Sequence, residues 1–530
     1  MIRVRQIKLP INNDTKEELI KKVSQKLKCK PLDINDYKIS KKSLDARHKP
    51  NLYYIYEVDI KIKNEAQILK RNINNNDIIK TPIEKYILPK PGNKKIKYNP
   101  IIVGSGPAGL FSAYILAEAG LSPIVIERGE PVEKRVTTVE KFWQAGELNK
   151  NSNVQFGEGG AGTFSDGKLN TLTKDKSYRM KKVFETFVEC GANEDILYIN
   201  NPHIGTDTLR TVVQNMRNKI IKLGGTFRYN TCLTNIIATN NQVTAIEVNS
   251  KEIINTNILV LAIGHSARDT FEMLNNLNLN LEPKPFAIGL RIQHPQIMIN
   301  ENQYGKNYFK ELPQASYKLT YKASNNRGVY SFCMCPGGYV VNASSEKGRL
   351  AINGMSYQTR DSVNANSAIV VTISPDDYGK NPLDGMNYQR HLEEKAYNLG
   401  NGKIPIQTLK DFHNNVESHS LGNISPIFKG AYHLSNLNKL FPQEVLISLK
   451  EALPYFDTKI KGFNQDDAII AGIESRTSSP IRIPRDEDLQ SVDITGLYPC
   501  GEGAGYAGGI TTAAIDGIKV AEQIIKKYYN

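Results

Sequence analysis

The sequence contains little cysteine or tryptophan: there are six cysteines and one tryptophan in 530 residues. No two cysteines are spaced as C-x-x-C, so we expect neither a disulfide framework nor a zinc site, and we predict no metal. No stretch approaches the roughly 18 apolar residues of a membrane span. The opening residues, MIRVRQIKLP, lack the apolar segment of a signal peptide. These absences exclude secreted and membrane-spanning proteins and predict a cytoplasmic location.

Charge is concentrated in one part of the chain. The formal net charge is +14, and residues 1–100 hold 24 Lys and Arg against 11 Asp and Glu, which gives +13. A basic module is typical of proteins that bind nucleic acid. Asn, Ile and Lys are frequent throughout the sequence, however, which favours the simpler interpretation of a solvated lysine surface. RNA binding stays open as an alternative.

The first 95 residues show the pattern of a small α+β module. Alternating apolar residues predict strands over residues 2–9, 37–40 and 52–62, and residues 15–28 predict an amphipathic helix with Thr15 as N-cap. The order β-α-β-β is typical of a ferredoxin-like module. Residues 88–99 combine Pro, Gly and Lys as in a linker, so we place a domain boundary near residue 95.

The remaining chain predicts an α/β domain interrupted by another domain. Strands at 101–103 and 123–126, several strands within 226–263 that end in the apolar run ILVLAIG, and helices at 107–119 and 206–223 indicate a Rossmann-like unit. Residues 496–500 and 510–528 return to a strand and a helix. We therefore predict a dinucleotide-binding domain in two parts, 96–282 and 456–530. Residues 283–455, with a helix near 386–399, form an inserted mixed-β substrate or cap domain.

A dinucleotide fingerprint lies in the first of these strand-helix units. It reads Gly104-Ser105-Gly106-Pro107-Ala108-Gly109, follows a strand, opens a helix, and precedes Glu127 by 23 residues counted from the first glycine. Gly104 permits the sharp turn, Gly106 the approach of a pyrophosphate, and Gly109 close helix–strand packing. Glu127 is expected to accept from ribose hydroxyls, while Arg128 leaves a 2'-phosphorylated nucleotide open.

Two further matches to GxGxxG lack this context. Residues 157–162 stand between polar segments and predict a loop that could cradle a cofactor through its backbone, although an ordinary surface loop is the alternative. Residues 503–508 do join a strand to a helix, but we expect no further strand after that helix, and so no acidic residue at the end of one. The sequence thus predicts one dinucleotide site.

Several longer segments carry a resemblance to a known group of proteins. They are NVQFGEGGAGTFSDGKLNT, PHIGTD, LAIGHSARDTF, PFAIGLRIQHP, SFCMCPGGYVV, ESRTSSPIRI and LYPCGEGAGYAGGITTAAIDG. With the fingerprint, they resemble flavoproteins of the glutathione-reductase-like FAD/NAD(P)-binding fold. More narrowly, the chain is similar to bacterial FAD-dependent dehydrogenases of undefined substrate with an N-terminal ferredoxin-like domain. The resemblance implies bound, non-covalent FAD and no particular reaction.

The resemblance also implies which residues hold FAD. Arg135 is expected at the pyrophosphate, Leu233 at the adenine through its backbone, and the helix that begins near Gly508 at the flavin, where its dipole favours negative charge. Glu502 stands where the family has Asp, so its partner is open. Beyond the fingerprint and Glu127, the expected set is Arg128, Arg135, Gly160, Ala161, Gly162, Thr163, Asp166, Gly167, Lys168, Leu233, Ala262, Ile263, Gly264, Gly501, Glu502, Gly508, Gly509, Ile510 and Thr511.

Catalytic residues are harder to identify, because flavin chemistry needs few protein groups. We predict that His265, directly after a strand end, lies with Arg476 in one flavin-facing cavity. His265 would exchange a proton there, and Arg476 would bind an anion. Arg291, His294, Arg476 and Arg482 predict either an anionic-substrate pocket or structural ion pairs. Strand alternation places Cys333 and Cys335 on one face, where buried inert thiols are commoner than redox pairs.

Together these observations predict an FAD-dependent oxidoreductase that acts on a small molecule, with an anion as one option. The flavin would be reduced by a substrate or by NAD(P)H, and any NAD(P)H would bind transiently, because the sequence shows one nucleotide site. The alternatives are a flavoprotein that acts on RNA and a non-catalytic flavin-binding module. A lipid reductase at membrane surfaces is disfavoured, since residues 15–28 carry no exposed aromatic residue. The oligomeric state is not predicted.

Overall fold

The N-terminal unit is a layer of helices on an antiparallel sheet. The computed structural model describes residues 1–171 and 173–530. The unit contains β1 (Ile2–Pro10), α1 (Lys16–Leu27), β2 (Ile34–Asp45), β3 (Tyr53–Ile62), α2 (Glu65–Arg71) and β4 (Ile78–Lys80). The strand order is β2-β3-β1-β4 with antiparallel neighbours. Thr15 accepts a hydrogen bond from the Glu18 amide and caps α1 as predicted. The order β-α-β-β is confirmed and continues to β-α-β-β-α-β.

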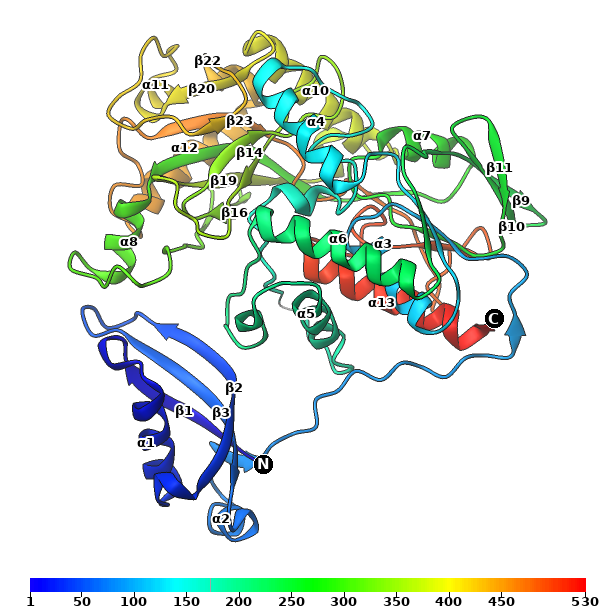
Figure 1. Ribbon diagram of the computed structural model, residues 1–530. Coiled ribbons are helices and arrows are strands. Elements are labelled where there is room, and N and C mark those ends of the chain that lie inside the picture. The colour runs from blue at the N-terminus through cyan, green and yellow to red at the C-terminus, as the bar shows by residue number, and fades with distance from the viewer. Residues whose placement is uncertain (172) are drawn as a thin grey trace.

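An extended segment connects this unit to the rest of the chain (Figure 1). It leads to β5 (Lys94–Lys95), which pairs with β26 (Tyr528–Tyr529) at the other end of the sequence. The unit also makes direct contacts: the Lys42 amide donates to the Tyr198 carbonyl, and Leu52 is part of the hydrophobic core of the inserted domain. These contacts hold the unit against both other domains.

The second unit is built on a parallel sheet. Its strands are β6 (Ile101–Val103), β7 (Ile124–Ile126), β8 (Thr226–Arg228), β12 (Leu259–Leu261) and β25 (Leu497–Pro499), in the order β25-β12-β6-β7-β8. Their short apolar runs are buried on both faces, as expected of parallel strands covered by helices. A small antiparallel sheet follows, of β9 (Leu233–Thr239), β10 (Gln242–Val248) and β11 (Glu252–Asn255). The predicted Rossmann-like unit is confirmed.

Helices from distant parts of the sequence pack together beside this sheet. Figure 1 shows α3 (Pro107–Glu118), α6 (Thr206–Lys222) and α13 (Ile510–Lys527) side by side, with α5 (Arg179–Glu189) next to them. A Cβ on Gly517 of α13 would lie 2.1 Å from the Ala108 carbonyl oxygen of α3. The glycine therefore permits an approach that brings the N-termini of α3 and α13 to the same edge of the sheet.

The third unit is a seven-stranded, mostly antiparallel sheet. It contains β14 (Phe286–Pro295), β15 (Thr320–Lys322), β16 (Gly328–Cys335), β19 (Asn364–Ile373), β20 (Ile404–Thr408), β22 (Tyr432–Leu434) and β23 (Ile469–Glu474), in the order β15-β16-β19-β14-β23-β20-β22. The predicted end of this domain at residue 455 is corrected, because β23 pairs with β14 and β20 inside the sheet. The domain thus extends to about residue 477.

The remaining elements surround these sheets. A second, three-stranded sheet has the order β18-β17-β21, formed by β17 (Tyr339–Asn342), β18 (Ile352–Met355) and β21 (Phe428–Lys429). A two-stranded pair joins β13 (Glu282–Pro283) to β24 (Ile481–Arg482). The other helices are α4 (Val132–Ala145), α7 (Arg268–Asn276), α8 (Gln296–Tyr304), α9 (Pro375–Tyr378), α10 (Asp384–Leu399), α11 (Leu409–Asn414) and α12 (Gln443–Asp457). Among the described residues, no helix has the length and apolar character needed to cross a membrane.

Candidate cofactor and substrate cavity

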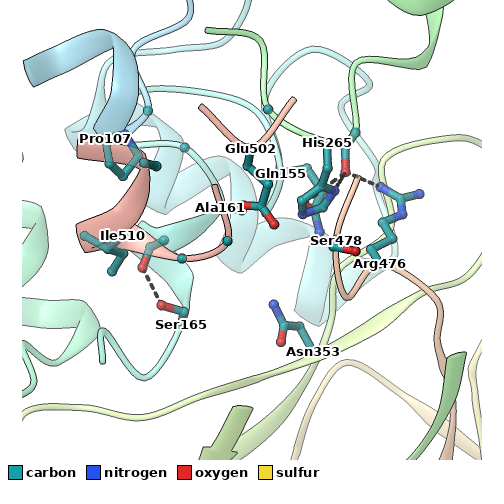
Figure 2. A pocket seen from close by; sticks show the side chains of 18 of the residues that line it. Pro107, Gln155, Ala161, Ser165, His265, Asn353, Arg476, Ser478, Glu502 and Ile510 are labelled. Carbon is teal, nitrogen blue, oxygen red and sulfur yellow. Dashed lines mark hydrogen bonds between the residues drawn. The ribbon is translucent and has the colours of Figure 1, made fainter. Parts of the chain in front are cut away.

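A cavity of about 930 Å³ lies where the carboxyl ends of the parallel strands meet the inserted domain. The turns after β6, β12 and β25 line one side of it, and residues of β16, β18 and β23 line the other. Ligands of open α/β sheets bind beyond the carboxyl ends of the strands. Figure 2 shows side chains from both domains pointing into this space.

Gly104 and Gly109 have the structural roles that the sequence predicts, and the role of Gly106 at a pyrophosphate stays a prediction. Gly104 has φ +96°, and a Cβ there would lie 2.4 Å from the Ala262 carbonyl oxygen. A Cβ on Gly109 would lie 1.9 Å from the Gly104 carbonyl oxygen, so this glycine sets the close helix–strand packing. Gly106 opens to the cavity, and the nearest atom that a Cβ on it would meet is the Cα of Gly160, at 3.8 Å. Two glycine turns therefore face each other across a narrow approach.

Two helices begin at this cavity without a capping side chain. Gly106 is the N-cap of α3 and Gly509 the N-cap of α13, and neither helix has a side-chain cap. The cavity wall includes the first residues of both helices, Pro107 and Ile510 (Figure 2). An uncapped N-terminus presents unpaired N–H groups and the positive end of the helix dipole. The cavity therefore offers two places where negative charge is favoured.

Glu127 ties the turns of the nucleotide end together. One carboxylate oxygen accepts from the amide and the hydroxyl of Ser105, at 2.9 and 2.8 Å. The other accepts from the amides of Gly129 and Gly157, at 2.9 and 3.1 Å. Four bonds occupy the acceptor sites of a carboxylate. The predicted bonds from Glu127 to ribose hydroxyls stay a prediction and would have to replace some of these.

Arg128 and Leu233 line the same end of the cavity, as expected. The guanidinium of Arg128 pairs with Asp269 and lies over the ring of Phe156, 4.4 Å from its centroid. The Arg128 side chain is thus held at the cavity wall by charge and by stacking. Its availability to a 2'-phosphate stays a prediction.

Arg135 does not reach the cavity, which corrects its predicted contact with the pyrophosphate. The side chain is fully buried, and its five hydrogen bonds, of 2.7 to 3.2 Å, all go to main-chain carbonyls. The acceptors are Asn153, Val154, Gly157, Glu158 and Gly160. Because α4 presents this arginine from behind the loop, it shapes the turn whose glycines line the cavity.

Five other predicted cofactor residues lie outside the cavity wall: Ser105, Gly109, Thr163, Gly501 and Thr511. Thr511 donates its hydroxyl to the Leu169 carbonyl at 2.8 Å, and Thr163 donates to the Glu158 carbonyl at 3.4 Å. These residues hold the wall in place. The predicted residues that do line it are Gly104, Gly106, Pro107, Ala108, Glu127, Arg128, Gly160, Ala161, Gly162, Asp166, Gly167, Lys168, Leu233, Ala262, Ile263, Gly264, Glu502, Gly508, Gly509 and Ile510.

Asp166 and Lys168 join the glycine loop to the inserted domain. The Lys168 ammonium donates to Asp166 at 2.6 Å and to the Met334 carbonyl of β16. Arg360 donates to Asp166 at 3.1 and 2.6 Å. Burial would raise the pKa of Asp166, but the two cations lower it to about 2. This wall of the cavity thus contains an ionised carboxylate that is held in place between two positive charges.

Glu502 points into the cavity from the turn after β25 (Figure 2). Burial raises the pKa of its carboxyl to about 7, although Lys284 and the Gly509 amide act in the opposite direction. A carboxyl with this pKa holds a proton part of the time near neutral pH. The group is therefore suited to proton transfer in a way that an ordinary exposed glutamate is not.

His265 and Arg476 both line the cavity and meet at Ser266 (Figure 2). The Nδ1 atom of His265 lies 2.9 Å from the Ser266 hydroxyl, and Arg476 donates to the same hydroxyl at 3.2 Å. Burial, with the charges of Arg476 and Arg268, lowers the pKa of His265 to about 3. The imidazole is therefore neutral near pH 7. Its catalytic role stays a prediction.

The guanidinium of Arg476 is largely committed to the protein. It binds the buried Glu393 carboxylate through two bonds of 2.9 and 2.8 Å, and donates to Ser345 at 2.6 Å besides Ser266. Arg268 binds the same carboxylate from the other side, at 2.8 and 2.7 Å. Four of the five N–H groups of Arg476 are thus used, which leaves little for the anionic substrate that the sequence predicts.

Three other residues of the predicted anionic pocket are not at the cavity wall. Arg291 is fully buried and pairs with Glu474 at 3.0 and 2.9 Å, and the Nε2 atom of His294 lies 2.7 Å from the Phe463 carbonyl oxygen. Arg482 is exposed on β24. Arg291 forms a structural ion pair, which is the alternative interpretation. The prediction that these residues form an anionic pocket is wrong.

Several wall residues are missing from the predicted set, although Gln155, Phe332 and Ser478 stand in segments that carry the family resemblance. Gln155, Asn353, Ser478 and the aromatic Phe332 line the cavity between the two domains. Their strands and turns meet the nucleotide end only through the tertiary fold. Recognising them from sequence would have required knowing how the inserted sheet is placed.

FAD fits the features of this cavity. A pyrophosphate needs positive helix ends and a close backbone approach, and both are present where Gly106 faces Gly160. The second uncapped helix, α13, suits the electron-rich edge of a flavin. The cavity volume of about 930 Å³ lies within the roughly 300–1,000 Å³ typical of cofactor sites.

Comparison with protein families agrees with these features. A family model described as "FAD-dependent protein, C-terminal domain-like" matches residues 285–477, which is the inserted sheet domain. An FAD binding domain matches residues 97–150, the fingerprint unit. A domain of unknown function matches residues 1–61 of the N-terminal unit.

The chain is also similar to individual proteins. An uncharacterized protein of Clostridium beijerinckii is 49% identical over 532 residues, which covers 99% of each chain. Among solved structures, glycine oxidase from Bacillus cereus is 12% identical, with a TM-score of 0.35 over 81% of this chain and 95% of that one. L-proline dehydrogenase from P. horikoshii is 13% identical, with a TM-score of 0.36 over 82% and 94%.

The two matched family models, one an FAD binding domain and one of an FAD-dependent protein, agree with the cavity that the structure shows, and the C. beijerinckii protein is related to the chain over nearly its whole length. The chain belongs to a family of FAD-dependent proteins that it shares with the C. beijerinckii protein, and FAD is its cofactor.

Proposed function

We propose that the protein is an FAD-dependent oxidoreductase, of the dehydrogenase type, that acts on a small molecule. The observation that carries this proposal is the single continuous cavity that runs from the dinucleotide cradle to side chains of the inserted domain. A binding module alone would need only the cradle. Here the cavity continues past Glu502 and His265 to Asn353, where a second molecule has room to contact the flavin end.

The residues that hold FAD follow from the cavity wall. The α3 N-terminus and the paired turns at Gly106 and Gly160 would hold the pyrophosphate, and Arg128 and Leu233 the adenosine. Gly509 and Ile510 at the start of α13 would face the flavin. When bound, FAD supplies hydride or electron transfer, and the protein supplies orientation and electrostatics.

Proton transfer falls to Glu502 in this proposal. Its carboxyl has a pKa of about 7 and opens to the cavity, so its carboxyl oxygen can give or take a proton near neutral pH. His265 has a pKa of about 3 and stays neutral there. It can accept a hydrogen bond or orient a ligand, but it is a poor proton donor at pH 7.

The electron donor is tested by anaerobic titration of the purified holoprotein. We expect NADH or NADPH to bleach the flavin absorbance without a stable complex, because the sequence holds one complete dinucleotide fingerprint. If neither nucleotide bleaches the flavin, a panel of small organic substrates takes their place in the same assay. If none of these compounds bleaches the flavin although dithionite reduces it fully, the proposed activity is contradicted.

A further inference from the structure

The strand β16 contains an irregularity at the cavity. Phe332 pairs with Ala368 and Cys335 with Asn366, so one strand carries an extra residue there, as in a β-bulge. Cys333 has φ +46°, in the left-handed region that few non-glycine residues adopt. Strand alternation is broken at this point.

The bulge gives the two cysteines different surroundings. Cys333 lines the cavity, whereas Cys335 is fully buried beneath it. The thiol of Cys335 donates to the Cys333 carbonyl at 3.2 Å, so the pair remains in contact. The expectation that regular alternation places both on one face is therefore corrected, whereas their reactivity stays a prediction. Bulges near cavities commonly re-aim a side chain in this way.

Positive charges surround the pair. The Lys168 ammonium binds the carbonyl of Met334, the residue between the two cysteines. The Arg291 guanidinium donates to the Cys333 carbonyl at 3.1 Å. The carboxylates nearby are already paired, Asp166 with Lys168 and Glu474 with Arg291. This arrangement favours a thiolate over a neutral thiol.

The pKa values follow from these contacts. Interaction of its thiol with the Cys335 side chain, together with the charges of Lys168 and Arg291, lowers the pKa of Cys333 to about 6 in spite of its burial. The same contact and burial raise the pKa of Cys335 well above its ordinary value. At neutral pH the pair thus consists of one thiolate, open to the cavity, and one thiol behind it.

We propose that Cys333 and Cys335 form a redox-active dithiol that exchanges two electrons with FAD bound in the cavity. The inference rests on the proposed oxidoreductase function. It adds that a dithiol in the same site is a redox partner of the flavin. In the oxidising direction the Cys333 and Cys335 sulfurs form an S–S bond. Cys333 enters this step as the thiolate, so one proton leaves Cys335, and two electrons together with that proton pass to oxidised FAD. Reduction runs the same step backwards.

The other cysteines of the cavity wall do not share these features. Cys232 lies at the adenine end, next to Arg128, and burial raises its pKa. Cys500 is fully buried at the end of β25, and burial raises its pKa well above the ordinary value. Each lacks a second cysteine two residues away. They serve as internal controls for thiol reactivity.

The test measures thiols directly in the full-length holoprotein. The protein is reduced with dithiothreitol, freed of reductant without oxygen, labelled with iodoacetamide, and digested for mass spectrometry. We expect Cys333 to be labelled faster than Cys232 and Cys500 at pH 7, with a rate that reaches half its maximum near pH 6. Equal labelling of the three cysteines, or a Cys333 labelling rate that rises only above pH 8, would overturn the assignment of Cys333 as a thiolate at neutral pH.

A second arm tests the disulfide. After one equivalent of the thiol oxidant diamide, we expect the peptide that holds both cysteines to lose the mass of two hydrogen atoms and its labelling. The variant Cys335→Ala should keep a labelled Cys333 under diamide, and Cys232→Ser should behave as wild type. Persistence of both free thiols in the wild type after diamide would overturn the proposal.

A third arm separates this inference from the proposed function. Oxidised holoprotein is photoreduced without oxygen, and free thiols are counted afterwards. We expect the Cys333–Cys335 disulfide to open as the flavin passes its electrons on. A disulfide that forms with diamide but stays closed when the flavin is reduced would refute electron exchange while leaving the FAD-dependent activity intact. Purified protein that holds no FAD would instead contradict the proposed function.

Discussion

Replacing Arg135 with methionine should destabilise the loop of residues 153–160 even when no cofactor is present. The guanidinium satisfies five main-chain carbonyls, and among the described residues those of Asn153 and Val154 accept no other hydrogen bond. An unsatisfied buried polar group costs about 1–3 kcal/mol. Two such groups, together with the loss of charge-assisted bonds to the other three carbonyls, predict a loss of about 3–5 kcal/mol in the free energy of unfolding.

The single tryptophan gives a direct assay of this effect. Trp143 lies on the same helix as Arg135 and packs against Phe164, so its fluorescence reports the unfolding of this region in urea. The matched control is Lys134→Met, an exposed neighbour whose replacement should change stability by less than about 0.5 kcal/mol. If the Arg135 variant unfolds like wild type as apoprotein and differs only in its affinity for FAD, the arginine contacts the cofactor and our account of it is wrong.

Four further changes follow from the structure. Gly106→Val should abolish FAD retention and leave the apoprotein folded, as judged by circular dichroism, because the side chain enters the cavity and its Cβ meets no atom closer than 3.8 Å; a variant that keeps full FAD would refute the cradle. Gly109→Ala, unlike Gly106→Val, should disturb the fold itself, since its Cβ would lie 1.9 Å from the Gly104 carbonyl oxygen; unchanged thermal unfolding would contradict this. Glu393→Gln should lower the free energy of unfolding by about 3–5 kcal/mol, because it removes the charge between two buried arginines; a urea midpoint equal to wild type would refute it. Glu502→Gln should remove an inflection near pH 7 from the rate of flavin reduction, because the wild-type carboxyl loses its proton there; an inflection that persists would assign the titration to another group.

Local sequence patterns are enough to predict the parallel sheet and the fingerprint turn. Ile101–Val103 and Leu259–Leu261 are short apolar runs, and the glycines between strand and helix act within a few residues of one another. Likewise, the Thr15 cap depends on Glu18 three positions away. Features of this kind are determined by neighbours in the sequence, so they can be recognised without the tertiary structure.

Features that depend on distant partners cannot be predicted in this way. The anchoring of Arg476 to Glu393 joins positions 83 residues apart, and Arg135 binds carbonyls of a loop that follows its helix. Nothing in the local pattern distinguishes an arginine that faces a phosphate from one buried behind a turn. The strand Ile469–Glu474 escapes assignment to the inserted sheet for the same reason, because its partners β14 and β20 lie far away in sequence.

The bulge in β16 shows a further limit. Alternation along a regular strand places residues two apart on one face, and this rule assigns Cys333 and Cys335 the same environment. One extra residue opposite Ala368 and Asn366 changes the direction of Cys333. The pairing partner that creates the bulge belongs to another strand, so the sequence of β16 alone does not reveal it.

The measurement that tests the central claim most directly is the identification of the flavin in the purified protein. We predict an absorption spectrum with flavin bands, release of the flavin on denaturation, and chromatography that identifies it as FAD in a ratio near one per chain. This expectation follows from our proposal that the cradle around Gly106 holds the ADP portion of FAD. Purified protein that binds FMN instead, or that takes up no flavin when FAD is supplied, would contradict the account.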